Sequence, residues 1–256
     1  MSVPSIRFRA AAWMLFSCLS SSAYALHPLI TEDTGTQGSG GMQVELSVAH
    51  ERDRDGDTTT TQLDPAVALA YGVADTVDVF VAIPYLQLQS DAMADSARNS
   101  GWSDPELGFK WRFHERDSLS LAIVPAVLLP LGDDARGLGK GRAGYTLPLV
   151  LTRQWEGFAL HTEVGISGNR NTGSEREHLW HASLAMEHRL AESSLWVLDL
   201  GIDRNPDPAS NLNPAYLLGG VVHSIGQFDL SAGIKGGLNS AAPDRTLLLG
   251  LTWHGE

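Results

Sequence analysis

ELGFKWRF, residues 106–113, alternates strictly between large apolar side chains and polar or small ones. The odd-numbered positions hold Leu, Phe, Trp and Phe, whereas the even-numbered ones hold Glu, Gly, Lys and Arg. Successive side chains of a β-strand point to opposite faces, so this spacing places every apolar residue on one face. The stretch therefore predicts a strand with one apolar face and one charged face.

The same alternation recurs along the whole chain, and helical periodicity is almost absent. It defines twelve segments of about ten residues, which are 42–51, 62–72, 76–89, 104–113, 118–131, 143–154, 158–167, 178–190, 195–204, 214–224, 228–237 and 245–254. Prolines interrupt four of these segments. Because proline cannot donate to a strand ladder, we expect strand starts, bulges or barrel rims at those positions.

The connections between the segments alternate in length. Long ones cover 52–61, 90–102, 132–142, 168–177, 205–213 and 238–244, and short ones cover 73–75, 114–117, 156–157, 191–194 and 225–227. Outer-membrane barrels have short turns at the periplasmic end and longer loops outside, whereas a soluble sandwich shows no such asymmetry. The predicted fold is all-β, a transmembrane antiparallel β-barrel of about twelve strands in residues 42–256.

The N-terminus has the layout of a cleaved secretory signal peptide. Two arginines precede the apolar run AAAWMLFSCL, and a small-residue region ends in Ala23-Tyr24-Ala25. We predict a signal peptide over residues 1–25 and a periplasmic N-terminal segment over 26–41. An uncleaved anchor helix, and lipidation at Cys18, remain alternatives.

Composition excludes several classes of function. The formal net charge is −12, and loss of the two signal-peptide arginines makes the mature chain more negative. No basic stripe is present that could release counterions from nucleic acid, so no nucleic-acid partner is expected. No histidine or cysteine cluster has the spacing of a metal site, and no motif indicates a cofactor. We expect neither metal nor cofactor.

Projecting the alternation inward gives a charged lumen. The residues that we expect to line a permeation path there are Glu106, Lys110, Arg112, Glu163, His181, Glu187, Arg189 and Asp199. Charges in a dry lumen are costly, so these groups must pair, titrate or meet water. Two interpretations stay open, a path for solutes and an internal network of ion pairs that braces the barrel.

The polar stretch HPLITEDTGTQG follows the predicted cleavage site. Its proline and glycines make it too irregular for a packed element. We hypothesise that residues 27–40 enter the lumen from the periplasmic side as a gate or plug. Catalysis is not expected, since His178 and His188 have outward parity and nothing in the sequence couples them to Ser174 as a triad.

Several motifs resemble a family of Gram-negative outer-membrane proteins named for the MetA pathway of phenol degradation. They are HPLITEDTGTQGSGGMQVELSVAHER (27–52), YGVADTVDVFVAIPY (71–85), SDPELGFKWRF (103–113) and LWHASLAMEHRLAE (179–192). The resemblance covers most of the predicted mature chain and implies a transport function without a defined substrate. One departure is the C-terminus, where His254, Gly255 and Glu256 follow Trp253 instead of a terminal aromatic residue.

We therefore expect a non-enzymatic channel in the bacterial outer membrane that takes up small solutes passively, aromatic or hydrophobic ones among them. Its expected partners are outer-membrane lipid, the barrel-insertion machinery and the small-molecule solute. Two alternatives are a structural or sensory barrel with a closed lumen and a lipid-modifying outer-membrane enzyme.

Overall fold

The computed structural model describes residues 27–92 and 95–255. The predicted signal peptide and Cys18 lie outside the described residues. In the part of the chain that is described, no helix has the length and apolar character needed to span a membrane.

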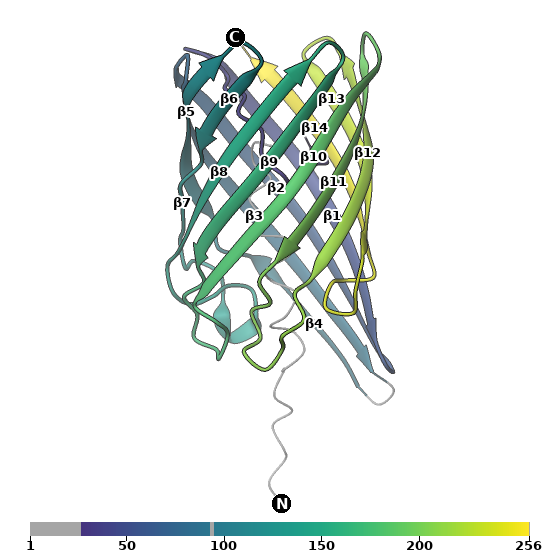
Figure 1. Cartoon of the computed structure of the whole chain (residues 1–256). Coiled ribbons are helices and arrows are strands. Elements are labelled where there is room, and N and C mark those ends of the chain that lie inside the picture. The colour runs from purple at the N-terminus through teal and green to yellow at the C-terminus, as the bar shows by residue number, and fades with distance from the viewer. Residues whose placement is uncertain (1–26, 93–94, 256) are drawn as a thin grey trace, which may run out of the picture.

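The described chain forms one antiparallel sheet that closes on itself as a barrel (Figure 1). Strand β1 pairs with β2 on one side and with β14 on the other, which completes the closure. The first strands are β1 (Met42–Asp55), β2 (Thr58–Ala74), β3 (Val77–Ala92), β4 (Asp95–Trp102), β5 (Glu106–Arg116), β6 (Leu119–Ile123) and β7 (Ala126–Leu128). A short 3-10 helix η2 (Asp134–Arg136) precedes β8 (Gly144–Trp155), β9 (Phe158–Gly168), β10 (His178–Ala191), β11 (Ser194–Asp203), β12 (Ala215–Ile225), β13 (Phe228–Gly237) and β14 (Arg245–Gly255).

Two of the barrel strands are interrupted, so the fourteen segments make twelve barrel strands. β4 and β5 both pair with β3 and are separated at Pro105, while β6 and β7 both pair with β5 and β8 and are separated at Pro125. Proline lacks the amide hydrogen that a ladder requires, which explains both interruptions. The prediction of a closed antiparallel barrel of about twelve strands is confirmed.

Alternating burial along the strands shows which face points inward. In β5, Lys110 is 1% exposed, whereas Leu107 on the opposite face is 50% exposed. The exposed large apolar residues of the other strands continue this outward apolar surface around the barrel. A closed barrel leaves no unpaired edge, and an apolar outer surface suits contact with lipid. The molecule is an outer-membrane β-barrel.

The two ends of the barrel differ, as Figure 1 shows. The short-turn end carries the turns β2–β3, β5–β6, β8–β9, β10–β11 and β12–β13 together with the C-terminus. The long-loop end carries residues 129–143, 169–177, 204–214 and 238–244. These two names are used below.

Two predicted long loops are hairpin extensions instead. Residues 52–61 continue β1 and β2 to a tight turn at Gly56, where φ is +57°, and the Thr-rich start of β2 pairs with the end of β1. Residues 90–92 extend β3, and residues 95–102 form β4. The Asp55-Gly56 pair is a hairpin signal, and β-branched threonine favours strands, which accounts for the first of the two hairpins. Both hairpins project beyond the barrel rim (Figure 1).

The loop 129–143 folds inward over one side of the long-loop end. Its Leu138 is buried against Leu86 and Leu88 of β3. Both carboxylate oxygens of Asp104 accept backbone hydrogen bonds from this loop, at 2.8 Å from Gly132 and 2.7 Å from Lys140. These contacts cover the β3–β4 side of the barrel mouth.

Candidate functional site

Residues 27–41, called the plug below, lie inside the barrel, surrounded by inward-facing side chains. Leu29, Thr31 and Glu32 are almost completely buried although no strand contains them. The plug enters from the short-turn end, because it leads directly into β1, whose first residue Met42 pairs with Gly255. The lumen is therefore occupied by the chain's own N-terminal segment.

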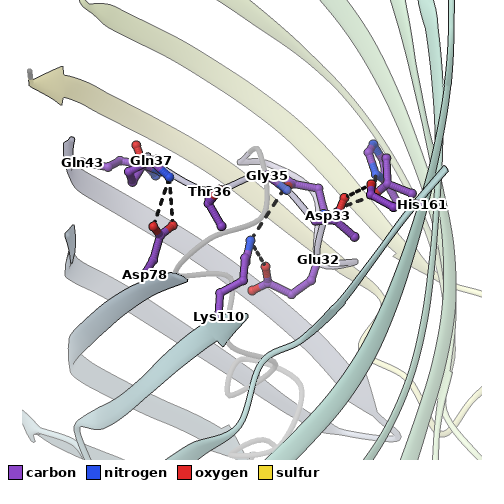
Figure 2. A network of polar contacts seen from close by, with 12 residues as sticks. Glu32, Asp33, Gly35, Thr36, Gln37, Gln43, Asp78, Lys110 and His161 are labelled. Atoms are coloured by element: carbon purple, nitrogen blue, oxygen red, sulfur yellow. Dashed lines mark hydrogen bonds and ion pairs between the residues drawn. The ribbon is translucent and has the colours of Figure 1, made fainter. Parts of the chain in front are cut away.

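The end of the plug next to β1 is held by the β2–β3 side of the wall. Backbone hydrogen bonds join Gly40 and Gly41 to Gly72. The backbone amide of Gln37 donates to both carboxylate oxygens of Asp78, at 3.1 and 3.0 Å (Figure 2). Gly72 must lack a side chain, because a Cβ there would collide with the carbonyl oxygen of Gly38.

The middle of the plug contains a buried ion pair. Lys110 of β5 places its ammonium 3.0 Å from Glu32 Oε2 and 3.6 Å from Asp33 Oδ1 (Figure 2). The Glu32 amide donates to Glu163 Oε2 of β9 at 2.8 Å. Burial raises the pKa of Glu32 to about 8, and the Lys110 charge opposes that shift.

The far end of the plug binds to the opposite wall through Asp199 of β11. One of its carboxylate oxygens accepts from the amides of Ile30 and Thr31, at 2.7 and 2.8 Å, and the other accepts from the Thr31 hydroxyl at 2.8 Å. Leu29 and Ile30 pack on a small apolar area of the inner wall that contains Leu218. Beyond them, His27 Nδ1 lies 2.7 Å from Ser231 Oγ. Burial lowers the pKa of His27 to about 4.

A serine, a histidine and an aspartate lie in line beside the plug. His181 Nε2 is 2.9 Å from Ser183 Oγ, and His181 Nδ1 is 2.6 Å from Asp203 Oδ1. This is the order of contacts in a catalytic triad. The serine hydroxyl, however, already lies 2.7 Å from Thr31 Oγ1, within hydrogen-bond distance, and is buried. Amides in the middle of paired strands are used by the ladder, which leaves them unable to stabilise an oxyanion.

The eight residues expected from sequence to line a path are distributed over the whole height of the barrel. Glu106, Lys110, Glu163 and Asp199 are buried, and all but Glu106 contact the plug directly. Glu187 pairs with His161 at 3.1 Å, and His181 with Asp203. The remaining two lie at the short-turn end, where Arg112 bonds the Asp75 carbonyl and Arg189 is exposed. The plug thus brings three of the eight together and leaves Arg112 and Arg189 outside the cluster.

Sequence reasoning missed several inward residues on the other side of the barrel. Tyr216 of β12 is buried and donates to Asp199 at 3.2 Å. Glu51 and Gln62 face each other in the β1–β2 register and are both buried. Period-two counting from Glu45 places Glu51 on the inward face, so this residue could have been found. Tyr216 could not, because an aromatic residue near a strand end resembles the aromatic residues that lie at the membrane interface.

A cavity of about 530 Å³ opens at the long-loop end, on the side that the loop 129–143 leaves uncovered. Its walls come from the β1–β2 hairpin and from the loops 205–214 and 240–244. Ile30 of the plug forms part of its lining, together with Tyr216 and Lys235. A solute entering from this end would therefore meet the plug.

The solved structures with the same fold are membrane barrels of several kinds. The COG4313 outer membrane channel from Pseudomonas putida F1 is 13% identical, with a TM-score of 0.71 over 87% of this chain and 98% of that one. The translocator domain of the autotransporter NalP from Neisseria meningitidis is 11% identical, with a TM-score of 0.59 over 84% and 88%. The CymD monoaromatic hydrocarbon channel is 8% identical, with a TM-score of 0.51 over 87% and 90%.

These identities establish a shared fold and no more. A search of curated proteins finds no match. A family model, by contrast, matches residues 27–254, which include the plug and every strand of the barrel. The chain belongs to the family described as "Putative MetA-pathway of phenol degradation".

Proposed function

We propose that this barrel is an outer-membrane channel for the passive uptake of small solutes and that the plug gates it. The observation that carries the proposal is the position of the plug: it occupies the lumen, and a cavity of about 530 Å³ lies on its outer side. A barrel braced only for stability would need no such cavity. A solute-sized space above a removable obstruction is what a gated channel requires.

The contacts of the plug are suited to reversible binding. Most are hydrogen bonds from single amides or hydroxyls to wall side chains, as at Asp78 and Asp199. Each such bond to a carboxylate contributes about 1.5–3 kcal/mol net, because the undocked groups would bond to water instead. The apolar contact is limited to Leu29, Ile30 and their neighbours. The plug can therefore be stable in place without being fixed there.

Small aromatic or apolar solutes are the favoured substrates. The family description names phenol degradation, and CymD, which shares the fold, is described as a monoaromatic hydrocarbon channel. The cavity supports this choice, since Ile30, Leu212 and Pro214 contribute apolar surface to its lining. Its size falls within the range of about 300–1,000 Å³ that small-molecule sites usually have.

The path that we propose runs from this cavity past the plug to the short-turn end. Glu163, Asp199 and Lys110, which hold the plug, would face water once it leaves, and Glu106, His181 and Glu187 line the same inner surface. Arg112 and Arg189 would act at the short-turn mouth. Insertion by the barrel-assembly machinery belongs to the same proposal.

Proteoliposome swelling tests the function. Wild-type protein and a variant in which residues 27–38 are replaced by a Gly/Ser linker of equal length are compared with small neutral solutes. The linker keeps the chain length and removes the side-chain contacts, so we expect faster swelling. Equal swelling rates in two correctly folded proteins would favour a structural or sensory barrel with a closed lumen.

We further propose that the protein is not an enzyme. The contacts of Ser183, His181 and Asp203 are explained by docking of Thr31, whose hydroxyl lies within hydrogen-bond distance of the serine. Replacing Ser183 with Ala should alter plug docking alone. Loss of an ester- or lipid-cleaving activity in that variant would instead support the lipid-modifying alternative.

A further inference from the structure

The cavity at the long-loop end contains a lysine whose ammonium makes no hydrogen bond to another described residue. Lys235 of β13 is only 5% exposed, yet it lines the cavity. Among the described residues, the one carboxylate within ion-pair distance of its ammonium is Glu51, at 3.9 Å. That distance is too long for a hydrogen bond. The ring of Tyr216 lies 5.7 Å from the same ammonium, which is within range of a cation–π contact.

The inner wall below the cavity explains why this lysine is held in place. Gln62, Glu51, Thr246 and Lys235 are consecutive partners in the registers of β2, β1, β14 and β13, so they form one row across four adjacent strands. Within the row, Thr246 donates to Glu51 at 3.2 Å. Glu51 therefore balances the charge of Lys235 without bonding to its ammonium. A buried ammonium has three donors and ordinarily bonds with them.

The rim of the cavity determines which ligands can approach this lysine. Asp53, Asp55, Asp203 and Asp244 contribute carboxylates to its lining, and Arg54 contributes one cation. This excess of negative charge repels anions at the entrance. At the inner end, a cationic ammonium group has no lone pair with which to accept a hydrogen bond from Lys235. A neutral molecule with a hydrogen-bond acceptor is not repelled by the rim and can accept a hydrogen bond from Lys235.

We propose that the cavity is a binding site for a neutral aromatic molecule with one hydroxyl or carbonyl oxygen. The oxygen accepts a hydrogen bond from Lys235 Nζ, and the ring lies against the apolar lining near Tyr216 and Leu212. The inference rests on the proposed function and names its substrate class. Because Ile30 also lines the cavity, a bound solute contacts the plug.

The test is a matched ligand series with the same ring and different charge. Benzyl alcohol, benzoate and benzylammonium are titrated calorimetrically into the full barrel in lipid nanodiscs, and heats from empty nanodiscs are subtracted. Benzyl alcohol should bind about tenfold more tightly than benzylammonium, the factor expected of one hydrogen bond to a charged donor. It should also bind more tightly than benzoate, which the carboxylates of the rim repel. Equal binding of all three would overturn the inference.

Variants separate the lysine from general effects. Lys235→Met should weaken binding of benzyl alcohol about tenfold, whereas Lys235→Arg keeps a charged donor and should retain most of the affinity. The control is Arg153→Met, which removes another cation over an aromatic ring, 5.4 Å from the Trp155 centroid, at the short-turn end. Unchanged binding in Lys235→Met, or an equal loss in Arg153→Met, would refute the assignment. If the ligands do not bind as expected but the barrel still passes solutes, this inference fails and the channel function stands. If the ligands bind selectively but no solute passes, the channel function is refuted and the binding site stands.

Discussion

Substitution of Lys110 by Met should open the lumen in a pH-dependent way. The Lys110 ammonium lies 3.0 Å from Glu32 Oε2, and both side chains are at most 2% exposed. Removing one partner of a buried ion pair typically costs about 3–5 kcal/mol, because the other charge stays buried without compensation. At alkaline pH, where Glu32 must be ionised, this cost shifts the docking equilibrium of the plug by a factor of about 10²–10⁴.

The same substitution should have little effect in acid. Burial raises the pKa of Glu32 to about 8, so at pH 5 the docked carboxyl group is neutral and the loss is that of one hydrogen bond, about 1 kcal/mol. We therefore expect Lys110→Met to shorten the closed dwell times of single channels strongly at pH 9 and weakly at pH 5. Wild type is measured at each pH, so titration of other groups cancels in the comparison.

Two further variants make this experiment decisive. Glu32→Gln combined with Lys110→Met should remove the pH dependence, since no buried carboxylate remains at that position. Lys140→Met is the control, because it breaks a buried pair with Glu175, 2.8 Å away, that does not touch the plug. Identical closed dwell times for Lys110→Met and wild type at pH 9, or an equal change at both pH values, would refute the role of the pair.

Three more predictions concern the other contacts of the plug. Asp199→Asn should increase the open probability in planar bilayers, because the variant loses the charge that accepts from the amides of Ile30 and Thr31; an unchanged open probability would contradict this. Acidification should weaken docking through His27: burial lowers its pKa from 6.5 to about 4, so its contribution is complete above pH 6.5 and is lost as pH falls towards 4. His27→Asn should remove this acid limb of the conductance–pH curve, and an unaltered limb would exclude His27 as its source. Gly72→Ala should displace the plug near Gly38 and increase proteolysis of the N-terminal segment, whereas Gly219→Ala, where a Cβ meets only Leu198 at 3.5 Å, should resemble wild type.

The strands could be predicted because each carries its own evidence. In β5 the membrane requires apolar residues at Leu107 and Phe109, and the lumen tolerates Lys110, so period-two alternation is unavoidable. The hairpin extensions were missed because residues 52–61 and 90–102 lie beyond the apolar belt. Both of their faces meet water there, and polar strands of this kind resemble loops in composition.

The contacts of the plug could not be predicted from the sequence. Glu32 pairs with Lys110 and Thr31 with Asp199, across 78 and 168 positions respectively, and no local pattern specifies such partners. Parity places Lys110 and Asp199 inward but does not say which of the many inward charges each polar group of the plug meets. For Arg189, period-two counting predicts an inward side chain. The residue lies at the end of its strand, however, and its side chain is exposed at the rim.

Single-channel conductance in planar bilayers tests the central claim, that the plug closes a path through the barrel. Wild-type protein is compared with the variant in which a Gly/Ser linker replaces residues 27–38, and the heat-dependent change in gel mobility confirms that both are folded. We predict rare, brief openings for wild type and long-lived, ohmic steps of larger conductance for the variant. A folded variant that stays as silent as wild type would show that the lumen is closed by its wall, and would contradict the gated channel.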